Sequence, residues 1–122
     1  MVIGGASAIG WAVAQGLAAG GRQVTIADRN ADGATERAAD LGAPHDAARV
    51  DMADEASVAA LFERTRPFDI VVNTAGIDGF GRITEQPVED FRAIIDCGHP
   101  DPRQGLARRF QRPRVLSVGP AQ

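Results

Sequence analysis

The sequence contains no tyrosine and no lysine: all 13 of its basic residues are arginine. This absence excludes any mechanism in which the chain itself supplies a phenol or an amine side chain. One cysteine, Cys97, cannot form an internal disulfide, and with His45 and His99 it provides no ligand set spaced for zinc. No stretch approaches the roughly 18 apolar residues that span a bilayer, and the basic region and cleavage site of a signal peptide are missing. We therefore expect a cytoplasmic protein without a metal site or a membrane partner.

Basic charge is also scarce over most of the chain. The net charge is −3, and residues 1–97 carry 15 of the 16 acidic residues, whereas residues 98–122 carry five arginines and Asp101. A negative chain whose basic end holds one aromatic residue, Phe110, is a poor candidate for binding nucleic acid. We interpret residues 1–97 as one folded domain and residues 98–122 as an irregular tail rich in arginine and proline.

Hydrophobic patterns alternate between those of strands and those of helices along residues 1–97. Short apolar or β-branched runs at 1–3, 23–27, 47–51 and 68–76 predict strands, and stretches at 9–19, 31–41, 54–66 and 87–97 predict helices. In the first helix, Ile9, Val13 and Leu17 fall on one face, and Ala14 and Ala18 extend it. Such alternation indicates an α/β fold, a Rossmann-like doubly wound parallel sheet with strand order 3-2-1-4.

One edge of the fourth strand has no expected neighbour within residues 1–97. The tail holds four of the seven prolines, and RVLSV at 114–118 is the one run there with strand character. Unless that run or another chain pairs with the fourth strand, its open edge favours a homo-oligomer or a partner that completes the sheet.

The first ten residues, MVIGGASAIG, have the pattern of a phosphate-binding turn. Met1–Ile3 predicts the end of a strand, Gly4 and Gly5 a tight turn, and Gly10 a close contact between the next helix and the strand. Ala8 replaces the middle glycine of the usual pattern. Because backbone N–H groups at a helix N-terminus bind phosphate, the segment predicts a site for the pyrophosphate of a dinucleotide. A purely structural loop is the alternative.

Asp28 follows the second predicted strand, 18 residues after Gly10. An acid here accepts hydrogen bonds from both hydroxyls of an adenosine ribose and repels a 2′-phosphate, which favours NAD over NADP. Arg29 argues the other way, because an arginine pairs with that phosphate, and helix capping is the alternative for Asp28. Asp51 ends the third strand and Asn73 follows the apolar run of the fourth, at the edge where such sheets bind ligands.

Together these segments resemble the classical short-chain dehydrogenase/reductase family, in the family's order, over residues 1–97. GGASAIG is similar to its TGxxxGxG turn, NTAG at 73–76 is similar to its NNAG motif with Thr74 for the second asparagine, and PVEDFRAIIDC looks like the helix that follows. The resemblance implies an NAD-dependent oxidoreductase that moves a hydride between NAD(H) and an alcohol or carbonyl compound. It also implies these cofactor-binding residues: Gly4, Ser7, Ala8, Ile9, Gly10, Asp28, Arg29, Asp51, Met52, Asn73, Ala75 and Gly76.

The family's catalytic residues are missing from this chain. The resemblance implies a Tyr-x-x-x-Lys pair for acid/base chemistry, a serine one strand earlier and an asparagine on the helix after NNAG. The asparagine aligns with Gly98, and Ser117 in RVLSV follows Cys97 too closely to be the family's serine. The chain therefore resembles the cofactor-binding half of such an enzyme, truncated before its catalytic pair and inactive alone. The abrupt end of the match after Cys97 indicates, as a hypothesis about the gene, a departure from the family's reading frame.

Other interpretations fit parts of the pattern. A non-catalytic module that binds NAD or completes a partner's sheet needs neither tyrosine nor lysine. Methyltransferases that bind S-adenosylmethionine share the glycine turn and the acid, but the NTAG segment argues against them. Extended nucleotide-sugar epimerases have a glycine where Ser7 stands. For the substrate entrance, the sequence offers Asp78, Phe80 and Arg82.

Overall fold

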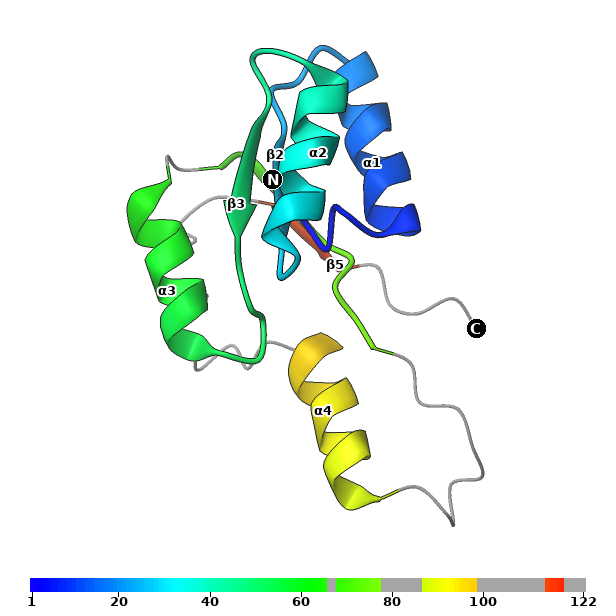
Figure 1. Ribbon diagram of the computed structural model, residues 1–122, viewed down its shortest axis with the longest axis vertical. Coiled ribbons are helices and arrows are strands. Elements are labelled where there is room, and N and C mark those ends of the chain that lie inside the picture. The colour runs from blue at the N-terminus through cyan, green and yellow to red at the C-terminus, as the bar shows by residue number, and fades with distance from the viewer. Residues whose placement is uncertain (66–67, 78–86, 99–113, 118–122) are drawn as a thin grey trace.

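Strands and helices alternate along the residues that the computed structural model describes, 1–65, 68–77, 87–98 and 114–117 (Figure 1). The strands are β1 (Val2–Ile3), β2 (Thr25–Asp28), β3 (Asp46–Arg49), β4 (Ile70–Asn73) and β5 (Arg114–Ser117). The helices are α1 (Ala8–Ala19), α2 (Ala31–Leu41), α3 (Glu55–Arg64) and α4 (Val88–Gly98). Every strand and helix predicted within residues 1–97 is therefore present.

The strands are all parallel and lie in the order β3-β2-β1-β4-β5. This confirms the doubly wound α/β fold and the predicted order 3-2-1-4. β5 adds a strand to that order, because a short piece of the tail segment pairs with β4 and Val115 lies opposite Val71. The edge of β4 is thus covered by the chain itself.

Short polar side chains fix where α1, α2 and α3 begin. Ser7, Asn30 and Asp54 are the N-caps of these helices, and each accepts a hydrogen bond from a backbone N–H of the first turn. Each cap stands a few residues after the end of a parallel strand. The N-termini of the three helices therefore gather at one edge of the sheet, the edge formed by the carboxyl ends of the strands.

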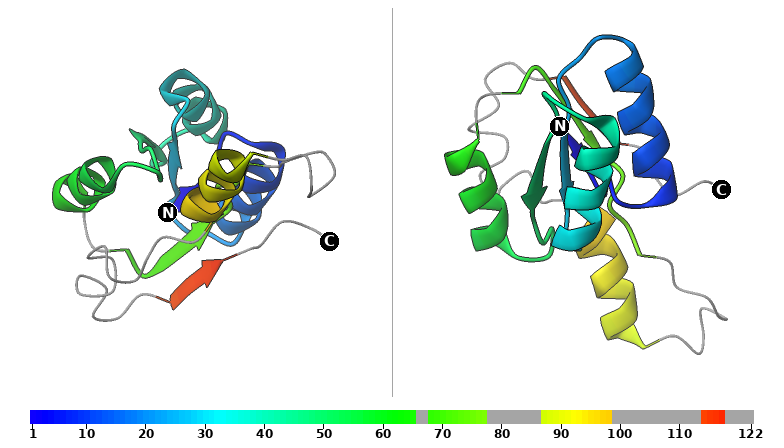
Figure 2. Two further views of the ribbon diagram at one scale, coloured as in Figure 1. Left: turned by 90° about the horizontal axis from the view of Figure 1, so that it is seen from below. Right: turned by 45° about the horizontal axis from the view of Figure 1, so that its top comes forward.

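Different helices cover the two faces of the sheet. α1 and α2 pack on one face, around Val2, Val24 and Ile26, and α3 packs on the other, around Ile3 and Val71. Figure 2 shows α1 and α2 standing together, with α3 apart from them. Because helices lie on both faces, β1 at the centre of the sheet is buried on both sides, as its apolar sequence requires.

The apolar face expected in α1 packs against the sheet except at Ile9. Gly10 and Ala14 are the buried residues of the helix, while Ile9 is 55% exposed and Val13 and Leu17 are partly buried. Small residues let the helix backbone approach the sheet closely, which turns Ile9 toward solvent.

Two other elements differ from the sequence prediction. β3 ends at Arg49, two residues before Asp51. In α4, Val88 and Ile95 of the expected apolar face are 67% and 47% exposed, because α4 lies beyond the carboxyl edge of the sheet (Figure 1). Within the described part of the chain, no helix has both the length and the apolar character to cross a membrane.

Candidate functional site

The turn between β1 and α1 lies at the carboxyl edge of the sheet and is built around Gly4. Gly4 has a φ of +77°, a left-handed conformation that glycine adopts without strain. A Cβ at this position would stand 2.7 Å from the backbone nitrogen of Ala75. The Gly4 N–H donates to the carbonyl oxygen of Ala27 at 2.8 Å, which ties the turn to β2. Glycine is therefore required here by both conformation and space.

Gly10, in the first turn of α1, is held just as tightly. A Cβ on Gly10 would collide with the carbonyl oxygen of Gly4 and would lie 2.7 Å from Oγ1 of Thr74. Thr74 donates both its backbone N–H and its Oγ1–H to the carbonyl oxygen of Ile3, each at 2.8 Å. The start of α1, the end of β1 and the end of β4 thus meet with no room for a methyl group.

The N-terminus of α1 offers hydrogen-bond donors at the same edge. Ser7 closes the turn, because its Oγ donates to the carbonyl oxygen of Gly4 at 2.6 Å and accepts from the N–H of Gly10 at 3.3 Å. The N–H groups of Ala8 and Ile9 belong to the first turn, where an α-helix provides no backbone acceptor, and both residues are exposed. Together with the positive end of the helix dipole, these donors form an arrangement that binds anions.

Asp28 joins three segments at the end of β2. Its Oδ2 accepts the N–H of Ala6 in the glycine turn, and its Oδ1 accepts the N–H of Asn30 before α2, both at 3.0 Å. The residue is half-buried, and each carboxylate oxygen has a further lone pair. Asp28 can therefore hold the turn in place and still accept two hydrogen bonds from hydroxyl groups.

Asp51 and Met52 follow β3 and connect to α3. The Asp51 carboxylate accepts the N–H of Ala53 at 3.0 Å, and the Asp51 N–H donates to Oγ of Ser57 at 3.0 Å. Met52 is 7% exposed and packs in the apolar cluster with Val58. The side chain of Met52 thus belongs to the core, which leaves its backbone to contribute to a ligand site.

The segment that follows β4 turns back beside the glycine turn. Asn73 is 5% exposed, and its Oδ1 accepts the N–H of Ala75 at 3.1 Å, which redirects the chain at the end of the strand. Asn73 lies opposite Ile3 in the sheet, so the segment from Asn73 to Gly76 borders the start of the turn. Gly76 itself is exposed.

The arrangement fits the parts of a dinucleotide. A tight glycine turn, N–H donors at a helix N-terminus and a carboxylate at the end of the neighbouring strand suit a pyrophosphate and a ribose. The glycine turn, Asp28 and the segment after Asn73 are connected by the hydrogen bonds and close contacts above. Arg29 is exposed and, among the described residues, forms no ion pair.

Sequence reasoning did not assign Ala6, Ser57 or Thr74 to the site. The sequence does single out Thr74, because it stands where the NNAG motif has its second asparagine. It does not single out Ala6, since a backbone donor becomes visible only once the turn and β2 are placed. Asp78, Phe80 and Arg82 lie outside the described residues.

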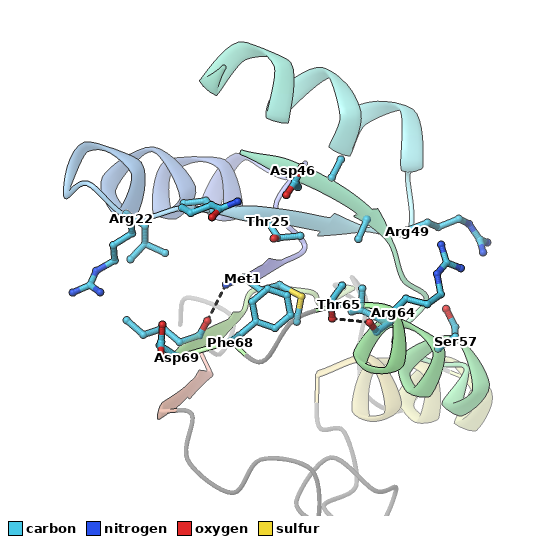
Figure 3. Close-up of a pocket in the computed structure, with 18 of the residues that line it drawn as sticks. Met1, Arg22, Thr25, Asp46, Arg49, Ser57, Arg64, Thr65, Phe68 and Asp69 are labelled. Carbon is cyan, nitrogen blue, oxygen red and sulfur yellow. Dashed lines mark hydrogen bonds between the residues drawn. The ribbon is translucent and has the colours of Figure 1, made fainter. Parts of the chain in front are cut away.

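A cavity of about 1270 Å³ lies elsewhere, between the sheet and α3 (Figure 3). Met1, Thr25 and Phe68 line it, and no residue of the glycine turn or Asp28 does. Burial lowers the pKa of the Met1 ammonium, against a smaller opposite effect of Asp69, and this ammonium donates to the carbonyl oxygen of Ile70 at 2.8 Å. The cavity extends from the amino ends of the strands to Arg49 and Ser57, so it reaches the border of the candidate site.

Comparison with known proteins gives consistent matches over the same residues. A family model described as short chain dehydrogenase matches residues 1–99. The chain is 38% identical over 94 residues to a 3-oxoacyl-[acyl-carrier-protein] reductase of Homo sapiens, covering 74% of this chain and 40% of the relative. It is 37% identical over 102 residues to D-threitol dehydrogenase of Mycolicibacterium smegmatis, covering 78% of this chain and 39% of the relative. The chain thus spans about 40% of the length of these curated relatives.

Solved structures agree with the fold. A 3-ketoacyl-(acyl-carrier-protein) reductase from Brucella melitensis, complexed with NADH, superposes with a TM-score of 0.83 at 27% identity, covering 97% of this chain and 55% of that one. A sorbitol-6-phosphate 2-dehydrogenase from Erwinia amylovora superposes with a TM-score of 0.77 at 27% identity, covering 97% and 52%.

Proposed function

Because the chain belongs to the short-chain dehydrogenase/reductase family, we propose that residues 1–97 form the cofactor-binding part of an oxidoreductase acting on an alcohol or carbonyl compound, with NAD(H) preferred over NADP(H). The observation that carries the proposal is the Asp28 carboxylate, held by the N–H of Ala6 at 3.0 Å beside the helix N-terminus. The NADH in the Brucella melitensis reductase supports the cofactor class.

In this proposal each part of the site holds one part of the cofactor. The N–H groups of Ala8 and Ile9 bind the pyrophosphate, Asp28 accepts the hydroxyls of the adenosine ribose, and Asp51 with the Met52 backbone borders the adenine. The segment from Asn73 to Gly76 supports the opposite side of the glycine turn. When bound, the nicotinamide donates or accepts the hydride.

The chain on its own carries no acid/base pair of the kind the family uses, since it has neither tyrosine nor lysine. We therefore propose that it binds the cofactor without turning over a substrate by itself. The second candidate function, a module that completes a partner's sheet through β4, is less favoured because β5 already pairs with β4.

A titration of the 122-residue chain with NADH, followed by nucleotide and Trp11 fluorescence, tests the proposal. We expect saturable binding, and we expect Asp28→Ala to weaken it about tenfold or more, because a charged hydrogen-bond acceptor is lost. Asp32→Ala is the matched control, since Asp32 is an exposed acid in the first turn of α2. No saturable binding, or equal losses in the two variants, would contradict the proposal.

A further inference from the structure

An arginine stands directly across the sheet from Asp28. In the parallel pairing of β2 and β3, Asp28 lies opposite Arg49, and neighbouring strands are about 4.8 Å apart. The residues one step earlier, Ala27 and Ala48, both pack on the α3 side of the sheet. Side chains alternate along a strand, so Asp28 and Arg49 leave their strands on the same side, and Arg49 at the edge strand also borders the cavity beside α3.

The Arg49 guanidinium is available to a ligand. Arg49 is exposed and forms no ion pair with another described residue. The ion pair in that part of the chain joins Arg37 to Asp40. Figure 3 shows the Arg49 side chain extending from the carboxyl end of β3, away from Asp46 at the start of the strand. The cation therefore stands at the same edge as the glycine turn, one strand away from the carboxylate.

Asp28, by contrast, is already engaged with the protein. Two backbone N–H groups donate to its oxygens, so its negative charge is fixed in position at the end of β2. A 2′-phosphate on the adenosine ribose would approach this carboxylate and be repelled by it. A cation fixed one strand away, within the reach of an arginine side chain, offsets part of that repulsion and can donate to the phosphate directly.

We propose that Arg49 is a selectivity residue for the cofactor, which lets the site accept NADPH as well as NADH despite Asp28. The inference rests on the proposed function, because it concerns the adenosine end of the same site. Arg49 differs from Arg29 because the pairing of β2 with β3 fixes the position of Arg49 next to Asp28. Arg29 lies in the turn after β2.

The test compares NADH and NADPH binding to the 122-residue chain and to Arg49→Ala. We expect the variant to bind NADPH about tenfold more weakly while its affinity for NADH changes less than about twofold, because the lost interaction involves the 2′-phosphate alone. Adenosine 2′,5′-bisphosphate and 5′-AMP, as smaller probes, should show the same difference. The selectivity of the unmodified chain should also shift toward NADH as salt is raised, since exposed charges are screened.

Arg22→Ala is the matched control. Arg22 is equally exposed and, in the described part of the chain, likewise unpaired, but it precedes β2 at the opposite edge of the sheet. Equal effects of Arg22→Ala and Arg49→Ala, or equal losses of NADH and NADPH in Arg49→Ala, would overturn the inference alone. Absence of binding of either nucleotide to the unmodified chain would reject the proposed function, and this inference with it.

Discussion

At the scale of single residues, two glycines of α1 have opposite surroundings. A Cβ on Gly10 would meet the carbonyl oxygen of Gly4 and Oγ1 of Thr74, whereas a Cβ on Gly16 would meet nothing within 4 Å. Both residues lie in the same helix, where glycine costs about 1 kcal/mol relative to alanine. The difference between them therefore isolates the effect of packing at the candidate site.

We expect Gly10→Ala to lower the free energy of unfolding by about 1–3 kcal/mol, because the added methyl forces α1 away from β1 and β4. Gly16→Ala should raise it by about 0.5–1 kcal/mol, since the helix loses a flexible residue and gains no clash. Urea unfolding followed by far-ultraviolet circular dichroism measures both. If Gly10→Ala were as stable as Gly16→Ala, the close packing described for the turn would be wrong.

At the scale of elements, β1 is a two-residue strand held between two four-residue strands. Thr74 stabilises β1 on the side of β4, because its backbone N–H and its Oγ1–H both donate to the carbonyl oxygen of Ile3. Thr35 provides a comparison, since its Oγ1 donates to the carbonyl oxygen of Ala31 at 2.9 Å within the exposed side of α2. The first bond joins two elements and the second stays within one.

We expect Thr74→Val to lower the free energy of unfolding by about 1 kcal/mol, the usual contribution of such a hydrogen bond. It should also speed hydrogen exchange of the Val72 N–H, which donates to the carbonyl oxygen of Met1 at 2.9 Å. Thr35→Val should change stability by less than about 0.5 kcal/mol, as exposed substitutions do. Similar losses in both variants would show that the contact between β1 and β4 adds nothing beyond a local bond.

At the scale of the whole molecule, the amino terminus is anchored far along the sequence. The Met1 ammonium donates to the carbonyl oxygen of Ile70, 69 residues away, and burial lowers its pKa from the usual 8.0. The unfolded chain therefore binds this proton more tightly than the folded chain. Between the lowered pKa and pH 8.0, the unfolded state holds more protons, so stability rises with pH.

We expect the free energy of unfolding to increase as the pH is raised through that window, and the contribution of this group to level off above about pH 8. Urea titrations in steps from about pH 6 to pH 9 measure the slope, with the intact mass confirming that Met1 is present. A chain with Gly-Ser added before Met1 is the control, because its amine is no longer at the buried position. The same slope in both chains would assign the pH dependence to other groups.

The sequence predicted the fold correctly where the local hydrophobic pattern agrees with the way the strands and helices pack. The alternation of strand and helix patterns predicted the order of the strands, and the spacing from Gly10 to Asp28 predicted a site at their carboxyl ends. Ile9 and Val88 show the limit: periodicity identifies an apolar face but not whether anything covers it. α1 approaches the sheet through Gly10 and Ala14, so Ile9 is exposed.

The contacts within the site depend on how the strands pair, which no local sequence pattern reveals. The bond from Ala6 to Asp28 requires the glycine turn and β2 to be in register, and the position of Arg49 follows from the pairing of β2 with β3. Thr74 was visible as a substitution in a motif, but its partner, the carbonyl oxygen of Ile3, lies at the other end of the folded domain in sequence. Strand register thus determines which of the predicted residues act together.

The hydrogen bond between Thr74 and Ile3 also has a consequence for synthesis, because the two residues are 71 positions apart. As the chain leaves the ribosome, the glycine turn and Asp28 emerge long before β4 is available to close the other side of β1. Loop closure over such a distance delays the pairing of β1 with β4 until late in folding. A nascent chain arrested before β4 would therefore carry the glycine turn and Asp28 without the contact from Thr74 that closes the other side of β1.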